Sequence, residues 1–457
     1  MSFGSVPGPT EAPSAVARGP SPYSVLQNRD LLLYLVGRFV SSLGQQMLSV
    51  AVGWELYART HSALNLGLVG LTQMVPMVLF TLPAGHVADN YNRKRVIILM
   101  TFVFACASLG LTLISGLQAP VFWIYFCLFA AGSARTFLWP ASSAFLPQLV
   151  SRQDFSRAVT WSSGSFQLSS VAGPACGGAI IALAGHAWPV YALNAGAALV
   201  CLSLISFVRT EHVVMLREEM TLASLIAGFK FVFASPIILG TITLDLFAVL
   251  LGGATALLPV FAKDILRMGP TGLAVVKAVL PRSFFTDPTH SPDALLLGLL
   301  QAALPLGSLL CALILAHRPP LQKAGRAMLW AVAIFGIATI GFGLSPWFWF
   351  SCLMLFLCGA VDNISVVVRH TLVQLLTPDE KRGRVSAVNS LFIGTSNELG
   401  GFESGFTAHL FGPFLGNTIA TGAVISVVSG GIGTILVVMA VALIWPAIRK
   451  YGRLDAG

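Results

Sequence analysis

Long apolar stretches recur along almost the whole chain, and they decide what it can fold into. Twelve of them have about the 20 residues that an α-helix needs to cross a bilayer core of about 30 Å. They lie at 31–56, 65–87, 96–117, 119–143, 158–183, 188–208, 237–262, 294–317, 326–344, 346–369, 387–411 and 422–447. Because each span must satisfy its own backbone in lipid, the sequence predicts an all-α membrane protein of about twelve transmembrane helices.

Few charges are available to cover a soluble surface. Only 10% of the 457 residues are charged, and 56% are hydrophobic. A soluble domain has roughly a quarter of its residues charged, so a bilayer is the expected environment.

Positive charge is unequally divided between the two sets of loops. By count along the sequence, 20 of the 27 Lys and Arg fall in the two tails and the even-numbered loops, and five fall in the other loops. This bias predicts that both termini are cytoplasmic, in a bacterial inner membrane. It also accounts for the net charge of +9 without nucleic acid.

The spans divide into two similar sets of six. Residues 146–154 match 372–380, and residues 70–73 match 298–301, at nearly one offset. Two six-helix repeats around a shared cavity are the expected architecture. The expected divisions are a disordered tail (1–30), an N-terminal bundle (31–208), a cytoplasmic linker (209–236), a C-terminal bundle (237–448) with an external insertion near 270–294, and a cytoplasmic tail (449–457).

Residues for catalysis or for binding a metal do not gather in the sequence. The seven cysteines lie in apolar stretches and the eight histidines are scattered, so we expect no metal site. No Ser/His/Asp grouping and no phosphate-binding loop is present, which disfavours an enzyme or an ATP-driven pump. We expect a monomer in the lipid bilayer that moves a small molecule and uses the proton gradient in place of a cofactor.

The loop after the second span carries the most specific motif. It holds Gly85, then Asp89 four residues on, then the basic cluster Arg93, Lys94 and Arg95. This resembles the signature loop of the major facilitator superfamily, although Asn90 and Asn92 stand where a basic residue and a glycine are usual. The resemblance implies that Asp89 meets the start of helix 11, near residues 384–386, and holds the cytoplasmic side shut.

Further stretches extend this resemblance over nearly the whole chain after residue 30. The fifth span looks like the motif of antiporter members, with the residues Gly164, Gly173, Pro174, Gly177 and Gly178. Its glycines would otherwise indicate close helix packing alone. Residues 244–249, 362–369 and 382–389 resemble the branch that holds the enterobactin exporter and related multidrug effluxers.

Four charges lie within spans that line the cavity in this superfamily. Arg38 and Arg135 belong to the first half, and Asp245 and Asp362 to the second. The repeat register pairs Arg135 with Asp362 and Arg38 with Asp245. We therefore expect the two cations of the first half to face the two anions of the second half across the cavity. Ion pairs within one half are the alternative.

Carboxylates inside the bilayer are candidates for proton coupling. Burial raises the pKa of a carboxylate, so that it can bind and release protons near neutral pH. Glu55, Asp245, Asp362, Glu398 and Glu403 lie in spans, and we expect Asp245, Asp362 or Glu398 to carry the proton.

Polar residues within the spans are candidates for binding the substrate. We expect an amphipathic pocket formed by Gln45, Gln46, Trp139, Asn363, Asn389 and Asn397. Hydrogen bonds between helices are the alternative for each.

Together these patterns predict a proton-coupled exporter of a siderophore-like or drug-like molecule that works by alternating access. An importer or a lipid flippase on the same fold is the alternative, and a membrane-embedded enzyme or receptor is disfavoured.

Overall fold

The computed structural model describes residues 23–209, 222–266, 291–318 and 322–452. These residues form helices joined by short connections, and they contain no strand. The first half comprises α1 (Arg29–Thr60), α2 (Ala63–Asn90), α3 (Arg93–Gly116), α4 (Phe122–Leu149), α5 (Phe155–Ala184) and α6 (Trp188–Phe207). The second comprises α8 (Pro236–Leu251), α11 (Pro292–Ala316), α12 (Ala324–Gly343), α13 (Phe348–Leu376), α14 (Asp379–Phe411) and α15 (Ile419–Ile444).

Short segments complete the described chain. They are η1 (Ser24–Gln27), η2 (Ala254–Leu257), α9 (Leu258–Val260), η3 (Phe261–Leu266), η5 (Pro413–Leu415), α16 (Pro446–Lys450) and the linker helix α7 (Leu222–Ala234).

Ten of the segments are long and apolar enough to cross a membrane, counting Pro236–Leu266 as one. Helices α1 and α14 are longer still, with 32 and 33 residues, but each carries several charged residues. With these two, the described residues contain the twelve expected spans. The chain is a multi-pass membrane protein.

Local sequence fixes where several helices begin. The side chain of Asn28 accepts hydrogen bonds from the first turn of α1, and the side chain of Asn92 does the same for α3. Ser62 and Thr418 occupy the corresponding positions before α2 and α15. Asn, Ser and Thr are favoured there because their oxygen atoms satisfy N–H groups that lack a partner within the helix.

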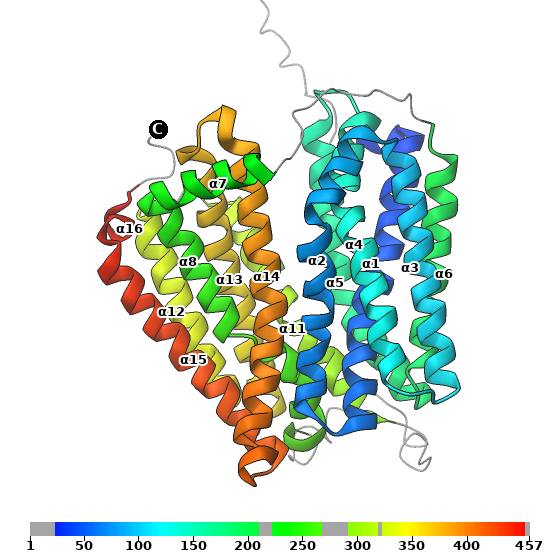
Figure 1. Cartoon of the computed structure of the whole chain (residues 1–457), viewed down its shortest axis with the longest axis vertical. Helices are drawn as coiled ribbons and strands as arrows, with labels where there is room; N and C mark the ends of the chain where they lie inside the picture. The colour runs from blue at the N-terminus through cyan, green and yellow to red at the C-terminus, as the bar shows by residue number, and fades with distance from the viewer. Residues whose placement is uncertain (1–22, 210–221, 267–290, 319–321, 453–457) are drawn as a thin grey trace, which may run out of the picture.

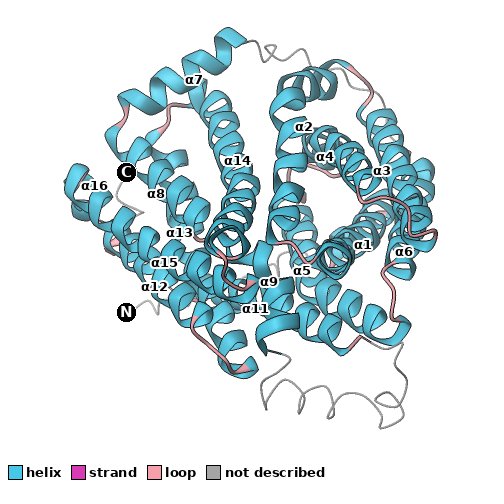
Figure 2. Cartoon of the chain, turned by 60° about the horizontal axis from the view of Figure 1, so that its bottom comes forward, coloured by secondary structure: helices cyan, strands magenta, loops and turns pink. Residues whose placement is uncertain are grey.

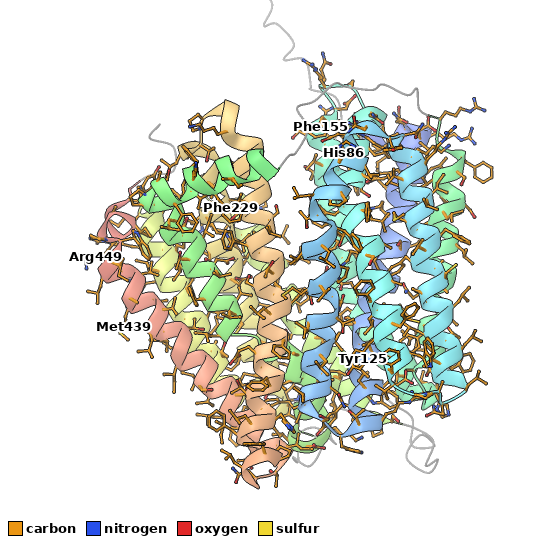
Figure 3. All side chains as sticks on the ribbon, viewed as in Figure 1. His86, Tyr125, Phe155, Phe229, Met439 and Arg449 are labelled. Carbon is orange, nitrogen blue, oxygen red and sulfur yellow. The ribbon has the colours of Figure 1, made fainter. Side chains whose placement is uncertain are left out.

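The helices gather into two groups, which lie side by side in Figure 1 and are seen from near one end in Figure 2. We call the end where α1 begins and α16 ends the termini face, and the end where α1 finishes at Thr60 the opposite face. The two groups diverge toward the termini face (Figure 1). Large apolar side chains cover the outside, as Met439 does on α15 (Figure 3).

The seventh span differs from the single helix expected over 237–262. Helix α8 ends at Leu251, Gly252 and Gly253 follow, and the chain continues through η2 and α9 into a π-helical turn, η3. Gly253 lies against α14, where a Cβ would be 2.8 Å from Oγ of Ser404. Such a break is tolerated inside a membrane protein where neighbouring helices cover the irregular backbone.

Two further differences concern charged segments. Helix α13 continues to Leu376, so Arg369, the last residue of the expected span 346–369, lies well inside a helix. The polar linker contains the helix α7, which crosses over the termini face of the second half (Figure 1). The expected disordered tail before residue 23, most of the 270–294 insertion and the last five residues lie outside the described residues.

Candidate functional site

A central cavity of about 620 Å³ lies between the two halves. Helices α1, α2, α4 and α5 of the first half contribute to its wall, and α11, α13 and α14 contribute from the second, together with η2 and α9. The cavity therefore lies at the interface between the two halves.

Carboxamide side chains dominate the polar part of the cavity wall. They are Gln45, Gln46, Gln73, Gln167, Gln301, Asn363 and Asn397. The side chain of Gln46 donates to Oγ of Ser170 at 2.8 Å, and that of Gln167 donates to the carbonyl oxygen of Pro305 at 3.3 Å. Oδ1 of Asn363 is buried without a hydrogen-bond partner among the described residues.

Among the described residues, one ion pair crosses the cavity. Arg135 on α4 donates from Nη2 to Oε1 of Glu398 on α14 at 2.9 Å, and both residues line the cavity. The Arg135 side chain is 49% exposed and the Glu398 side chain is 20% exposed, so a ligand in the cavity can reach either. Two opposite charges at this distance make the pair neutral overall.

The other expected partners are arranged differently. Asp245 on α8 forms a buried ion pair with Arg369 on α13, within the second half. Arg38 donates to Oγ of Ser142 at 3.5 Å, within the first half. In this conformation the ion pair across the cavity is Arg135–Glu398, not Arg135–Asp362. Asp362 directly precedes Asn363 on α13, and no ion pair with another described residue is found for it.

The two halves also meet near the opposite face. Nε1 of Trp54 donates to Oδ2 of Asp293 at 3.0 Å, and the hydroxyl of Tyr57 donates to Asp264. The ammonium of Lys263 lies 5.7 Å from the centre of the Tyr57 ring. We call the Trp54–Asp293 and Tyr57–Asp264 hydrogen bonds the opposite-face contacts. Both run from α1 to the second half, so they hold this end of the cavity closed.

Glycines bring backbones of the two halves together at the same end. A Cβ at Gly178 of α5 would overlap the carbonyl oxygen of Ala294 and lie 2.8 Å from Cα of Gly298 on α11. A Cβ at Gly70 of α2 would overlap the carbonyl oxygen of Glu398 on α14. Gly70 and Gly298 are equivalent positions of the internal repeat, so the repeat marks two related interfaces between the halves.

The other glycines of the fifth span pack within the first half. Gly173 and Gly177 lie against Gln46 and Met47 of α1, whereas a Cβ at Gly164 would meet nothing within 4 Å. Pro174 lines the cavity, and its carbonyl oxygen lies against Gly298.

The signature loop is bound largely within the first half. Arg93 donates to the carbonyl oxygens of Ala88 and Ala144, and Lys94 donates to those of Ser206 and Val208. Asp89 is half-buried near the end of α2, and Gly85 is buried one turn before it. The side chains of residues 382–384 lie outside the description, so the expected contact of Asp89 with the start of α14 stays a prediction.

Two of the expected pocket residues lie away from the cavity wall. Trp139 is 69% exposed and Asn389 is 3% exposed, and neither lines the cavity. The sequence reasoning also missed Arg369 and the opposite-face contacts. Arg369 was the last residue of the expected tenth span, and Tyr57 and Asp264 lie just beyond span ends, where polar and charged residues are ordinary.

Comparison with known proteins agrees with this geometry. The sequence profile of the Major Facilitator Superfamily matches residues 34–401. The chain belongs to this superfamily. It is 27% identical over 417 residues to the enterobactin exporters EntS of Escherichia coli O1:K1 / APEC and of Citrobacter koseri, covering 91% of this chain and 92% of each relative.

Solved structures of superfamily-like transporters share the fold. A bacterial homologue of the human lysosomal transporter Spinster, in an inward-facing and unoccupied conformation, has a TM-score of 0.66 at 15% identity, covering 95% of this chain and 99% of that one. A POT family transporter has a TM-score of 0.70 at 12% identity, covering 93% and 97%. The nucleoside transporter NupG has a TM-score of 0.66 at 12% identity, covering 92% and 99%.

Proposed function

We propose that this protein exports a small, amphipathic molecule across a bacterial inner membrane by proton antiport, with its termini face in the cytoplasm. The unequal distribution of Lys and Arg supports this orientation. The similarity to enterobactin exporters supports outward transport and a siderophore-like cargo. In this orientation the structure is closed toward the outside and the halves diverge toward the cytoplasm.

The cavity supports a cargo without net charge that forms many hydrogen bonds. Seven carboxamides offer both donors and acceptors, and the paired charges of Arg135 and Glu398 cancel. A cargo with an isolated charge would find no counter-ion at the wall unless it broke that pair, which is costly in a partly desolvated site. Apolar residues such as Phe104 and Phe166 complete an amphipathic lining.

The Arg135–Glu398 pair carries the proposal of proton coupling. A proton from the outside binds Glu398, neutralises the carboxylate and weakens the ion pair. This frees the Arg135 guanidinium and removes one contact between α4 and α14. Release of that proton to the cytoplasm restores the pair, so that cargo and proton move in opposite directions. Asp362 and Asp245 are less suited as carriers, because neither lines the cavity and Asp245 already has a buried partner.

Efflux in a host that lacks its own exporters tests this function. The panel contains enterobactin and lipophilic dyes, and accumulation is followed with and without a pH gradient. We expect wild-type efflux to stop when the gradient is collapsed, and Glu398→Gln to abolish proton release on cargo binding in proteoliposomes. Glu403→Gln is the matched control, because Glu403 lies on the same helix and accepts a hydrogen bond from Thr407 at 2.8 Å.

Two outcomes would contradict the proposal. Transport that continues unchanged without a pH gradient removes the coupling. Cargo uptake into right-side-out vesicles, driven by an inward proton gradient, makes the protein an importer.

A further inference from the structure

A second cavity, of about 670 Å³, lies outside the central site at the termini end of the first half. It is lined by Val87, Asn90, Tyr91, Asn92, Arg95, Val96, Leu99, Met100 and Phe137. These residues come from the end of α2, the start of α3 and the middle of α4. We call this cavity the α2–α3 pocket. None of its residues lines the central cavity, so the proposed transport path does not use it.

The three basic residues of the signature loop do not share one environment. Arg93 and Lys94 donate to backbone carbonyl oxygens at the ends of helices. Arg95 is exposed, lines the α2–α3 pocket, and makes no side-chain hydrogen bond or ion pair with another described residue. The loop thus keeps one guanidinium available to an outside partner.

Arg95 begins an exposed apolar stripe on α3. At helical spacing of three and four residues, the stripe continues through Leu99, Phe102, Cys106, Leu109 and Leu113, which are all exposed. In a membrane protein such a stripe faces lipid. Since α3 rises about 1.5 Å per residue, Leu99 lies about 6 Å and Phe102 about 10 Å below Arg95. A cation above an apolar surface matches a phospholipid, whose phosphate lies above its acyl chains.

The polar end of the pocket discriminates between headgroups. It contains one cation, the amides of Asn90 and Asn92, and the hydroxyl of Tyr91, but no carboxylate. A phosphate matches Arg95, and hydroxyl groups match the amides. An ammonium group, as in phosphatidylethanolamine, would find no anion among the lining residues.

We propose that the α2–α3 pocket binds an anionic membrane phospholipid of the phosphatidylglycerol type, with its phosphate on Arg95 and an acyl chain along Leu99 and Phe137. The signature loop is then a lipid-binding element as well as a contact between helices.

Native mass spectrometry of the full-length protein tests this assignment. The purified protein is mixed with equal amounts of dioleoyl-phosphatidylglycerol and dioleoyl-phosphatidylethanolamine, and the ratio of the two singly bound forms is measured. We expect Arg95→Gln to lower the preference for phosphatidylglycerol roughly fivefold, which corresponds to one basic residue at a membrane surface. Arg95→Lys keeps the charge and should retain most of the preference. Arg152→Gln is the matched control, because Arg152 is exposed in the loop after α4.

A separate substitution tests the part of the site that is proposed to bind an acyl chain. Leu99→Gln places an amide in the pocket and should reduce retention of both lipids, whereas Leu109→Gln, lower on the same exposed stripe, should not. An unchanged lipid ratio in Arg95→Gln, or an equal loss in Arg152→Gln, would overturn the assignment. Displacement of the lipid by excess inorganic phosphate would also overturn it, because the site would then recognise a free anion.

Discussion

At the scale of single residues, the Asp245–Arg369 pair places two opposite charges in the interior of the second half. Asp245 is 7% exposed and Arg369 is 2% exposed, and they join α8 to α13. Removing one partner leaves an uncompensated charge in a site of low dielectric, which costs about 3–5 kcal/mol. Removing both leaves no buried charge.

We therefore expect Arg369→Met to lower the thermal unfolding midpoint strongly, and Asp245→Asn combined with Arg369→Met to recover much of the loss. Detergent-solubilised protein and a tryptophan fluorescence melt suffice for the measurement. Arg157→Gln breaks the more exposed Arg157–Asp154 pair and should cost less than about 1 kcal/mol. A double variant as unstable as Arg369→Met alone would show that the pair is not the cause.

The hydroxyl of Tyr57 forms a contact between the two halves, so its removal should change the conformation more than the stability. Tyr57→Phe removes the hydrogen bond to Asp264 and keeps the ring. We expect a larger population in which the opposite face is open. Spin labels at Leu117, just after α3, and at Leu415, in η5, report this as a longer distance in a cysteine-free background.

Tyr125→Phe is the control for this measurement. Tyr125 lies near the opposite-face end of the first half (Figure 3) and donates to the carbonyl oxygen of Asn65 at 2.9 Å, within that half. Equal lengthening in both variants would mean that a lost hydroxyl loosens the fold in general.

At the scale of elements, α5 and α11 approach so closely that their backbones nearly touch. A Cβ at Gly178 would overlap the carbonyl oxygen of Ala294, and backbone atoms give way only if the helices separate. We expect Gly178→Ala to disfavour the closed opposite face and to reduce efflux at least tenfold while the protein still inserts and folds. Gly164→Ala on the same helix has open space around it and should leave efflux near wild type.

The broken seventh span connects two parts of the site. Gly253 follows α8 and lies against Gly400 of α14, two residues from Glu398, while η3 at the other end of the break carries Asp264. A change at the Arg135–Glu398 pair thus has a continuous packed route to the opposite-face contacts. If the route transmits the change, Glu398→Gln should also alter the distance between labels at Leu117 and Leu415.

At the scale of the whole molecule, the charge bias predicts which way the protein is inserted. Fusion of green fluorescent protein to the C-terminus should give fluorescent cells, and fusion of alkaline phosphatase at the same position should give an inactive enzyme, since the first folds in the cytoplasm and the second outside it. The reverse result would place the termini face outside and would reverse the proposed direction of transport.

The spans and the two halves could be predicted because both are local properties of the sequence. A run of about 20 apolar residues indicates a membrane-spanning helix, and an internal repeat indicates two related halves, without any knowledge of the rest of the fold. Arg135 and Glu398 were recognised individually for the same reason, since a charge within an apolar run stands out. The break at Gly252 and Gly253 was missed because Gly is common in membrane helices and does not by itself end one.

The pairing of these charges was decided only by tertiary structure. Whether Arg135 meets Asp362 on α13 or Glu398 on α14 depends on how the two bundles pack against each other. Arg369 stood at the very end of the expected span 346–369, whereas α13 continues to Leu376, so Asp245 was not assigned its partner. The sequence by itself determined that the chain crosses the bilayer about twelve times in two related halves, because lipid acts on each span separately. Which side chains meet between the halves depends on long-range packing, and no local pattern records it.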